Sequence, residues 1–228
     1  MQAVESRIQR AVAQSGRRRS EITLVAVSKK FSAEKIREAY EAGLRVFGEN
    51  YVQEFAEKQR HLADLRDAQF HLIGHLQSNK ARLACDLFQM IQTADSPKLL
   101  QRLNAAAEER GRVLEVLIEV KLSGEPNKSG ANPEDLPALL QAARACPNLE
   151  VSGLMTMPPW SDDPEPSRPY FQRLAQLARQ YDLPQLSMGM SGDFELAIEE
   201  GATIIRVGTA LFGRRPKPYQ EAAPPLAS

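Results

Sequence analysis

The sequence predicts an α/β protein that forms a single (β/α)8 barrel, also called a TIM barrel. Short apolar segments alternate with amphipathic ones along nearly the whole chain of 228 residues, and eight of the apolar segments have the length of a strand. Eight strand and helix pairs in about 200 residues lie at the small end of the range for this barrel. The alternative, an open doubly wound sheet, would show a glycine-rich dinucleotide turn after its first strand, and none follows here.

Each predicted strand is a short apolar run bounded by polar or turn-forming residues. The first, ITLVAVSK at 22–29, is rich in β-branched residues and lacks the alternation of a half-exposed strand. We therefore expect it to be buried on both faces, as in a parallel sheet covered by helices. The other strands are predicted at 44–47, 70–74, 87–93, 113–120, 151–155, 185–188 and 203–207.

The predicted helices carry apolar residues at helical spacing. A surface helix opens the chain at 1–16, because its apolar residues fall on one face. Ser32 can cap the helix that follows the first strand, at 33–42, and Gly43 is its stop signal. Further helices are predicted at 52–66, 78–86, 96–110, 134–145, 170–181 and 193–200. Each strand but the last is thus followed by a helix.

No repeat, low-complexity segment or change of composition marks a domain boundary. Residues 1–228 are therefore expected to form one domain, which with 43% hydrophobic residues can bury a sizeable core. Prolines in the last segment, 216–228, predict a flexible extended tail.

The composition excludes several classes of function. Lysine plus arginine and aspartate plus glutamate each number 29, and this zero net charge argues against a general nucleic-acid or acidic-membrane binder. The two cysteines, Cys85 and Cys146, lack metal-ligand spacing and give no disulfide framework, which suits a reducing cytoplasm. No apolar segment is long enough to span a membrane, and no signal peptide opens the chain. We expect a soluble cytoplasmic protein.

Lys29 is the first candidate site residue, because it stands at the carboxyl end of the first predicted strand. The carboxyl ends of the strands form the ligand face of such a barrel, and a desolvated lysine there can form a Schiff base with an aldehyde. The alternative is a strand-end lysine whose stem covers apolar surface while its ammonium stays in water.

Two loops near the end of the chain carry residues suited to a phosphate. After the seventh strand comes MGMSGD at 188–193, in which small residues let backbone N–H groups approach an anion and Ser191 adds a hydroxyl. After the eighth strand, Gly208 and Thr209 add further donors. The alternatives are that Ser191 caps a helix and that Gly208 makes a turn. The loops after strands seven and eight are where such barrels commonly bind phosphate.

Closing the barrel brings the last strand beside the first, so the phosphate loops and Lys29 become neighbours. That combination suits a phosphorylated aldehyde, and pyridoxal 5′-phosphate (PLP) is the leading candidate. A sugar phosphate is the competing ligand.

Other polar residues are weaker candidates. His71 and His75 flank a strand end rather than sharing a helix face, so we expect no metal site there. Glu49 can serve as a general base, but an ion pair with a nearby lysine or arginine is the commoner role of a strand-end glutamate.

Several segments resemble the pyridoxal phosphate homeostasis proteins, a PLP-binding family with the barrel of the alanine racemase N-terminal domain. The resemblance covers nearly the whole chain. The matching segments are AVSK at 26–29, FGENYVQE at 47–54, HLIGHLQSNK at 71–80, KSG at 128–130, GLMTM at 153–157, SMGMSGD at 187–193 and RVGTALFG at 206–213.

The resemblance implies a role for eight residues. Lys29 would be the Schiff-base lysine, and Arg206 would lie near the pyridine nitrogen. The remaining residues would be Ser191, Gly192, Gly208 and Thr209 around the phosphate, and Asn50 and Met155 beside the ring. The chain departs from the family pattern at Lys30, a second lysine directly after Lys29, and in the segment KLSGEPNKSG. Neighbouring strand residues point to opposite faces, so we expect only Lys29 to face the cofactor.

The resemblance also implies a function in PLP and vitamin B6 homeostasis rather than catalysis. Such a protein would hold the cofactor on Lys29, buffer it or hand it to amino acids or PLP-dependent apo-enzymes, and thereby influence amino-acid balance. An arginine at the pyridine nitrogen cannot supply a proton at neutral pH, and the chain ends too soon after the eighth strand for the second domain of the related racemases. We therefore expect a monomer without appreciable enzymatic activity. The alternatives are a racemase of low activity and a phosphosugar barrel enzyme.

Overall fold

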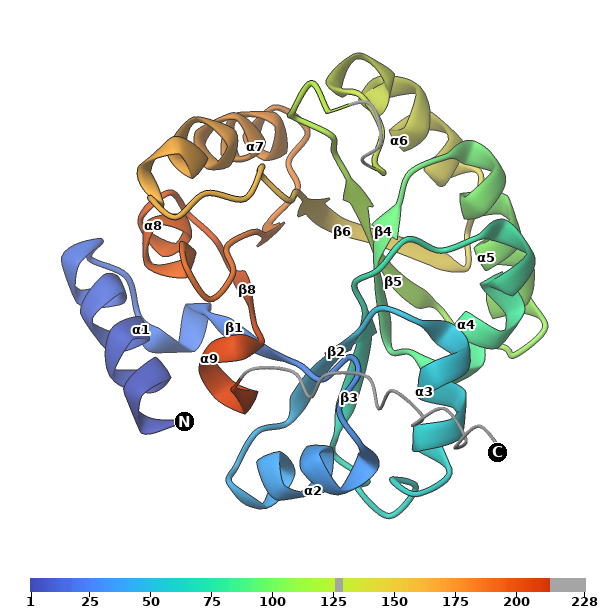
Figure 1. Ribbon diagram of the computed structural model, residues 1–228. Coiled ribbons are helices and arrows are strands. Elements are labelled where there is room, and N and C mark those ends of the chain that lie inside the picture. The colour runs from blue at the N-terminus through green and yellow to red at the C-terminus, as the bar shows by residue number, and fades with distance from the viewer. Residues whose placement is uncertain (126–128, 214–228) are drawn as a thin grey trace, which may run out of the picture.

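The computed structural model describes residues 1–125 and 129–213, and in them all eight predicted strands form. The strands close into one barrel in sequence order, and every neighbouring pair is parallel, as Figure 1 shows in a view into the ring. The strands are β1 (Thr23–Val27), β2 (Val46–Glu49), β3 (Gln69–Leu72), β4 (Met90–Ala94), β5 (Leu114–Glu119), β6 (Leu149–Met155), β7 (Gln185–Ser187) and β8 (Ile204–Val207). The predicted barrel is confirmed.

The helices form an outer ring around the strands. They are α1 (Gln2–Gln14), α2 (Ala33–Glu41), α3 (Val52–Gln59), α4 (Ala81–Leu87), α5 (Pro97–Glu108), α6 (Leu136–Arg144), α7 (Arg168–Gln180), α8 (Phe194–Glu199) and α9 (Thr209–Phe212), with 3-10 turns η1 (Arg19–Glu21), η2 (Ser78–Lys80), η3 (Pro133–Asp135) and η4 (Glu165–Ser167). None of the helices in these two described ranges is long and apolar enough to cross a membrane.

Several boundaries differ from the prediction; for example, β4 begins at Met90 instead of 87. The first strand ends at Val27 instead of 29. Ser28 still donates its backbone N–H to the Gly48 carbonyl at 2.9 Å, but the chain then turns, and Lys30 adopts a φ of +64° that no strand allows. Helix α3 ends at Gln59 instead of 66, and a short helix, α9, follows the last strand. The predicted tail at 216–228 and one residue of the KSG segment lie outside the described residues.

The two faces of each strand pack into different cores, as the period of two requires. The larger core lies between the sheet and the helices. A smaller cluster fills the barrel interior with Val25, Met90, Leu117, Met155 and Ile204. Two residues later on three of these strands stand the buried polar residues Gln92, Glu119 and Arg206, at the next level of the barrel. This polar upper layer marks the functional end of the barrel.

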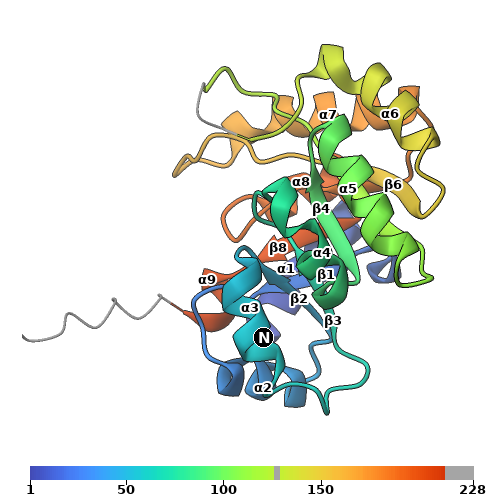
Figure 2. The same ribbon diagram turned by 90° about the vertical axis from the view of Figure 1, so that its right-hand side faces the viewer.

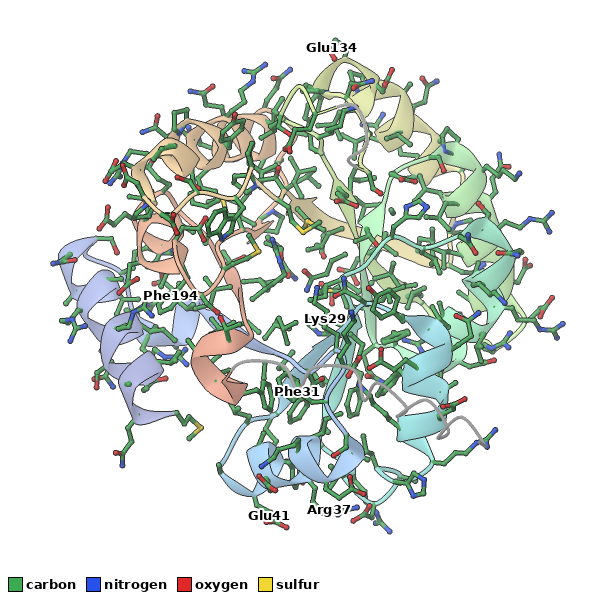
Figure 3. All side chains as sticks on the ribbon, viewed as in Figure 1. Lys29, Phe31, Arg37, Glu41, Glu134 and Phe194 are labelled. Carbon is green, nitrogen blue, oxygen red and sulfur yellow. The ribbon has the colours of Figure 1, made fainter. Side chains whose placement is uncertain are left out.

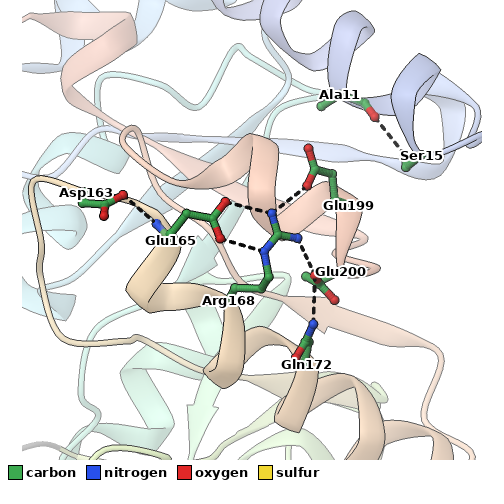
Figure 4. A network of polar contacts seen from close by, with 8 residues as sticks. All are labelled: Ala11, Ser15, Asp163, Glu165, Arg168, Gln172, Glu199 and Glu200. Atoms are coloured by element: carbon green, nitrogen blue, oxygen red, sulfur yellow. Dashed lines mark hydrogen bonds and ion pairs between the residues drawn. The ribbon is translucent and has the colours of Figure 1, made fainter.

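Arg168 ties the segment between β6 and α7 to helix α8 (Figure 4). It donates to Glu165 through Nε and Nη2, at 2.9 and 3.0 Å. It also reaches Glu199 at 3.1 Å and Glu200 at 2.6 Å. Figure 2, a side view, shows this segment and α9 projecting from the same end of the barrel. The network therefore fixes one wall of that end.

Candidate functional site

A cavity of about 650 Å³ opens at the carboxyl ends of the strands, on the side of β1, β7 and β8. Its size falls in the range of about 300 to 1,000 Å³ that is usual for small-molecule sites. Seven of the eight residues assigned from the sequence line it: Lys29, Asn50, Ser191, Gly192, Arg206, Gly208 and Thr209. The barrel therefore brings Lys29 and Thr209, which are 180 positions apart in the sequence, into one cavity.

Lys29 reaches the cavity from the turn after β1, and Figure 3 shows it within the ring of strands. Its side chain is half-buried. Lys30 is exposed and does not line the cavity, and its backbone N–H donates to Glu54 Oε1 at 2.6 Å. Our expectation that Lys29 and not Lys30 faces the site agrees with this placement. The reason given for it, that neighbouring strand residues point to opposite faces, was wrong, because both residues lie in a turn after the strand. The left-handed φ of Lys30 directs the chain away from the cavity.

The loops after β7 and β8 meet through the side chain of Ser191. Its Oγ accepts hydrogen bonds from the backbone N–H of Gly208 at 3.2 Å and of Ala210 at 3.5 Å. A methyl group added at Gly192 would meet no atom within 4 Å, so this edge of the cavity is open backbone. In this arrangement Ser191 Oγ is the acceptor for those two N–H groups, and the two loops bring a hydroxyl and backbone N–H groups together at one corner of the cavity. Groups of this kind bind a phosphate.

Arg7 holds the loop after β7 from helix α1. Its Nε donates to Glu195 Oε1 at 2.7 Å, and its Nη2 donates to Glu195 Oε2 at 2.5 Å and to the carbonyl oxygen of Ser191 at 3.2 Å. The guanidinium also lies over the ring of Phe194, 4.3 Å from its centroid. No local pattern predicts this contact, because residues 7 and 195 are 188 positions apart.

Arg206 points into the barrel interior and forms the floor of the cavity. It is 3% exposed, and it donates to Ser187 Oγ at 2.5 Å and to the carbonyl oxygen of Thr156 at 2.9 Å. Burial lowers the pKa of the Arg206 guanidinium to about 10, which still leaves it positively charged at neutral pH. The cavity therefore has a fixed cation on its floor.

A buried hydrogen-bond chain runs from Arg206 across the barrel. Ser187 Oγ donates to Gln92 Oε1 at 2.6 Å, and Gln92 Nε2 lies 3.0 Å from His71 Nδ1. Burial lowers the pKa of the His71 imidazole to about 4, so the ring is neutral and its Nδ1 can accept from the amide. The chain fixes the orientation of Arg206 through residues that sequence reasoning did not assign.

Glu119 is a second buried ionisable group in this upper layer. It lies two residues after Leu117, a member of the interior cluster, and is 3% exposed. Burial, with a smaller contribution from Asp95, raises the pKa of the Glu119 carboxyl to about 7, although Arg206 acts in the opposite direction. Its Oε2 has no hydrogen-bond partner among the described residues.

Asn50 and Met155 differ in their relation to the cavity. Asn50 lines it, and the buried Oδ1 of Asn50 has no hydrogen-bond partner within the described part of the chain. Gly74 lies so close behind Asn50 that an added methyl group would come within 2.4 Å of its carbonyl oxygen. Met155 is fully buried in the interior cluster and does not line the cavity. The structure therefore separates Met155 from the other assigned residues.

The rim holds residues that the sequence did not single out. Met157, Pro159, Trp160 and Ser161 line it from the segment between β6 and α7. Trp160 is 80% exposed, which is unusual for the only tryptophan of the chain. The signal available in the sequence was a lone tryptophan within a proline-rich loop.

His71 and His75 differ in burial and in their partners. His71 is buried inside the barrel, whereas the side chain of His75 is 52% exposed and its Nδ1 lies 3.7 Å from Asp95. Within residues 1–125 and 129–213, no group of three or more His, Cys, Asp or Glu side chains is arranged to hold a metal ion.

The sequence is similar to known proteins over most of its length. Residues 1–216 match the family described as alanine racemase, N-terminal domain. A protein of Aquifex aeolicus named pyridoxal phosphate homeostasis protein is 46% identical over 218 residues, covering 93% of this chain and 95% of the relative. A Pseudomonas aeruginosa protein of the same name is 46% identical over 214 residues, with 93% of both chains covered.

Solved structures share the fold. PipY of Synechococcus elongatus, in a structure described as having PLP bound, superposes with a TM-score of 0.80 at 42% identity, covering 91% of this chain and 100% of that one. An alanine racemase of Clostridium difficile superposes with a TM-score of 0.69 at 12% identity, covering 93% of this chain and 56% of that one. At that identity the racemase shows the barrel fold alone.

Proposed function

The chain belongs to the pyridoxal phosphate homeostasis proteins of the alanine racemase N-terminal domain family, and from that membership we propose that it binds PLP in the cavity at the carboxyl ends of its strands. The observation that carries the proposal is the cavity itself. One corner offers hydroxyl and N–H groups for a phosphate, the floor holds a buried cation, and a lysine also lines the cavity. The buried Oδ1 of Asn50, which has no hydrogen-bond partner among the residues that the structure describes, adds a polar atom that a ligand can satisfy.

When bound, PLP supplies an aldehyde, whose carbon forms a C=N bond with a lysine amine while the aldehyde oxygen leaves as water with two amine protons. We assign Lys29 as that amine, because it is the lysine that lines the cavity among the described residues. The turn after β1 presents its side chain within the ring of strands. Lys29 is therefore the reversible anchor.

The other assigned residues orient the cofactor. Ser191, Gly192, Gly208 and Thr209 would hold the phosphate through hydroxyl and backbone N–H groups. Arg206 would donate to the pyridine nitrogen, and its hydrogen bonds to Ser187 and Thr156 keep its guanidinium in place. Asn50 would contact the ring, and Met155 would support it from the interior layer below the cavity.

We further propose that the protein holds, buffers and hands on PLP, and that it does so in the cytoplasm as a monomer. An arginine at the pyridine nitrogen leaves that nitrogen unprotonated, which makes the ring a weak electron sink for catalysis. The exposed rim around Trp160 leaves room for an incoming amine from an amino acid or an apo-enzyme. Release would follow displacement of Lys29 by that amine, with effects on vitamin B6 and amino-acid balance.

Fluorescence of Trp160 offers a direct test. As the only tryptophan of the chain, at the rim of the cavity, it should be quenched when PLP binds. Borohydride treatment followed by peptide mass analysis should place a pyridoxyl group on Lys29. The Lys29→Ala variant should show no adduct, and Lys30→Ala is the matched control that should behave as wild type. Wild-type protein with neither quenching nor adduct would overturn the proposal and favour a phosphosugar enzyme.

An amino-acid racemase of low activity is the second candidate. The match to the alanine racemase N-terminal domain favours it. Incubation of the PLP-loaded protein with single enantiomers of several amino acids should leave their stereochemistry unchanged if the protein is a carrier. Measurable racemisation that disappears in Lys29→Ala would support the enzyme instead.

A further inference from the structure

A buried ionic cluster lies behind the turn that carries Lys29, outside the cavity. It consists of Glu49 at the end of β2 and of Glu54 and Lys58 on helix α3, and we name it the Lys58 cluster. The side chain of Glu49 is 0% exposed and that of Lys58 is 10% exposed. Neither residue lines the cavity, so the cluster has no part in the binding contacts proposed above. The predicted ion pair of Glu49 with a nearby lysine is confirmed.

Lys58 uses its full hydrogen-bonding capacity in this cluster. Its Nζ lies 3.1 Å from the carbonyl oxygen of Ser28, 2.9 Å from Glu49 Oε1 and 2.6 Å from Glu54 Oε1. An ammonium group has three donors, and these are three acceptors. Lys58 is therefore a structural lysine that joins two carboxylates to the backbone immediately before Lys29.

The cluster holds the turn on both sides of Lys29. On one side, Ser28 Oγ donates to Glu49 Oε1 at 2.7 Å, and the Ser28 carbonyl accepts from Lys58. On the other side, the backbone N–H of Lys30 donates to Glu54 Oε1 at 2.6 Å. Lys30 has a φ of +64°, a backbone conformation that costs free energy for a lysine. It persists only where the surrounding contacts hold the backbone in place.

The electrostatics agree with a rigid cluster. Burial raises the pKa of the Glu49 carboxyl, while Lys58 and Ser28 act to lower it. Glu49 Oε2 has no hydrogen-bond partner among the described residues. A buried ion pair contributes little net stability because desolvation offsets its attraction, but removing one partner is costly because the other charge is left buried without compensation.

We infer that the Lys58 cluster fixes the backbone on both sides of Lys29 and thereby directs its amine into the cavity for covalent attachment of PLP. This inference rests on the proposed function, because it takes Lys29 as the point of attachment. Glu49, Glu54 and Lys58 are positioning residues: they touch the turn and not the ligand.

The test separates attachment from phosphate binding by using two ligands. PLP can attach to Lys29, whereas pyridoxine 5′-phosphate has an alcohol in place of the aldehyde and cannot. We expect Glu54→Ala, at a partly exposed helix position, to weaken PLP binding about tenfold, because it removes the acceptor of the Lys30 N–H and one of the three acceptors of Lys58. Its affinity for pyridoxine 5′-phosphate should stay within about twofold of wild type, because the phosphate loops are untouched.

Two further variants make the result specific. Glu57→Ala, an exposed glutamate on the same helix, is the matched control and should bind both ligands as wild type does. Glu54→Gln keeps an oxygen that can accept from Lys30 N–H and should restore part of the PLP affinity. The fraction of Lys29 modified after borohydride treatment should follow the same order.

The outcomes distinguish this inference from the proposed function. Unchanged PLP affinity in Glu54→Ala, or equal loss of affinity for both ligands, would overturn the positioning role while wild-type attachment at Lys29 stands. Wild-type protein that forms no adduct at Lys29 would instead overturn the proposed function, whatever the variants do.

Discussion

Replacing Glu119 with glutamine should change how the stability of the protein depends on pH. Glu119 ends β5 inside the barrel, 3% exposed, with Oε2 unpartnered among the described residues. Burial and Asp95 raise the pKa of its carboxyl from about 4.5 to about 7. Folding therefore takes up a proton at this residue between those two pH values.

The sign of the effect follows from proton linkage. Between pH 4.5 and pH 7 the folded state binds more protons at Glu119 than the unfolded state does, so the free energy of unfolding falls as the pH rises. At about 1.4 kcal/mol per pH unit, the loss between pH 5 and pH 8 is about 2 to 3 kcal/mol. His71 has the opposite effect, because folding lowers the pKa of its imidazole from 6.5 to about 4. Its contribution to stability is therefore lost as the pH falls below 6.5. That contribution is common to both proteins and cancels in their difference.

Urea unfolding of the cofactor-free proteins at pH 5 and pH 8, followed by circular dichroism, measures this difference. The free energy of unfolding of Glu119→Gln minus that of wild type should be about 2 to 3 kcal/mol larger at pH 8 than at pH 5. The matched control is Glu150→Gln, at an exposed position of β6, which should follow wild type at both pH values. A stability difference between wild type and Glu119→Gln that is the same at pH 5 and pH 8 would refute the reasoning.

Three further predictions concern the loops of the cavity. Gly189→Ala should lower the free energy of unfolding by about 2 kcal/mol or more in a urea titration, because Gly189 has a φ of +90° and an added methyl group would come within 2.5 Å of Ala197 Cβ; an unchanged midpoint would contradict this. Arg7→Met should weaken the binding of PLP and of pyridoxine 5′-phosphate equally, by about threefold to tenfold, because Arg7 holds the loop of Ser191 and not Lys29. Unequal losses of affinity for the two ligands would contradict this prediction, and the same substitution at the exposed Arg10 provides the control. Arg168→Met should cost about 1 kcal/mol in thermal or urea unfolding, because its partners are partly exposed carboxylates; a loss above about 3 kcal/mol would show that the network is more than a set of surface ion pairs.

The order of elements in this protein can be predicted from its sequence. Apolar runs with β-branched residues alternate with amphipathic segments, and this local pattern is sufficient for the strands and for the barrel that the structure confirms. Gly43, with a φ of +100°, ends α2 as its residue type predicted. The motif resemblance was also confirmed, because the chain belongs to the family that the motifs indicated.

Residues of the site could be assigned where chemistry and position in the sequence coincide. Lys29, Ser191 and Gly208 each follow a predicted strand, and parallel strands of one barrel end at one face. Met155 also ends a strand, yet it packs into the interior cluster below the cavity. A residue's position in the sequence predicts at which end of the barrel it lies. It does not predict whether its side chain lines the cavity or packs in the layer below it.

Only the tertiary structure decided which charges are buried together. The ion cluster of Glu49, Glu54 and Lys58, the contact of Arg7 with the loop of Ser191, and the chain from Arg206 to His71 all join side chains from different elements. Their pKa values and orientations depend on desolvation and on distances of about 3 Å, which arise when helices and strands pack. Local sequence pattern determines the elements because it acts over a few residues, whereas these contacts exist only after the barrel has closed.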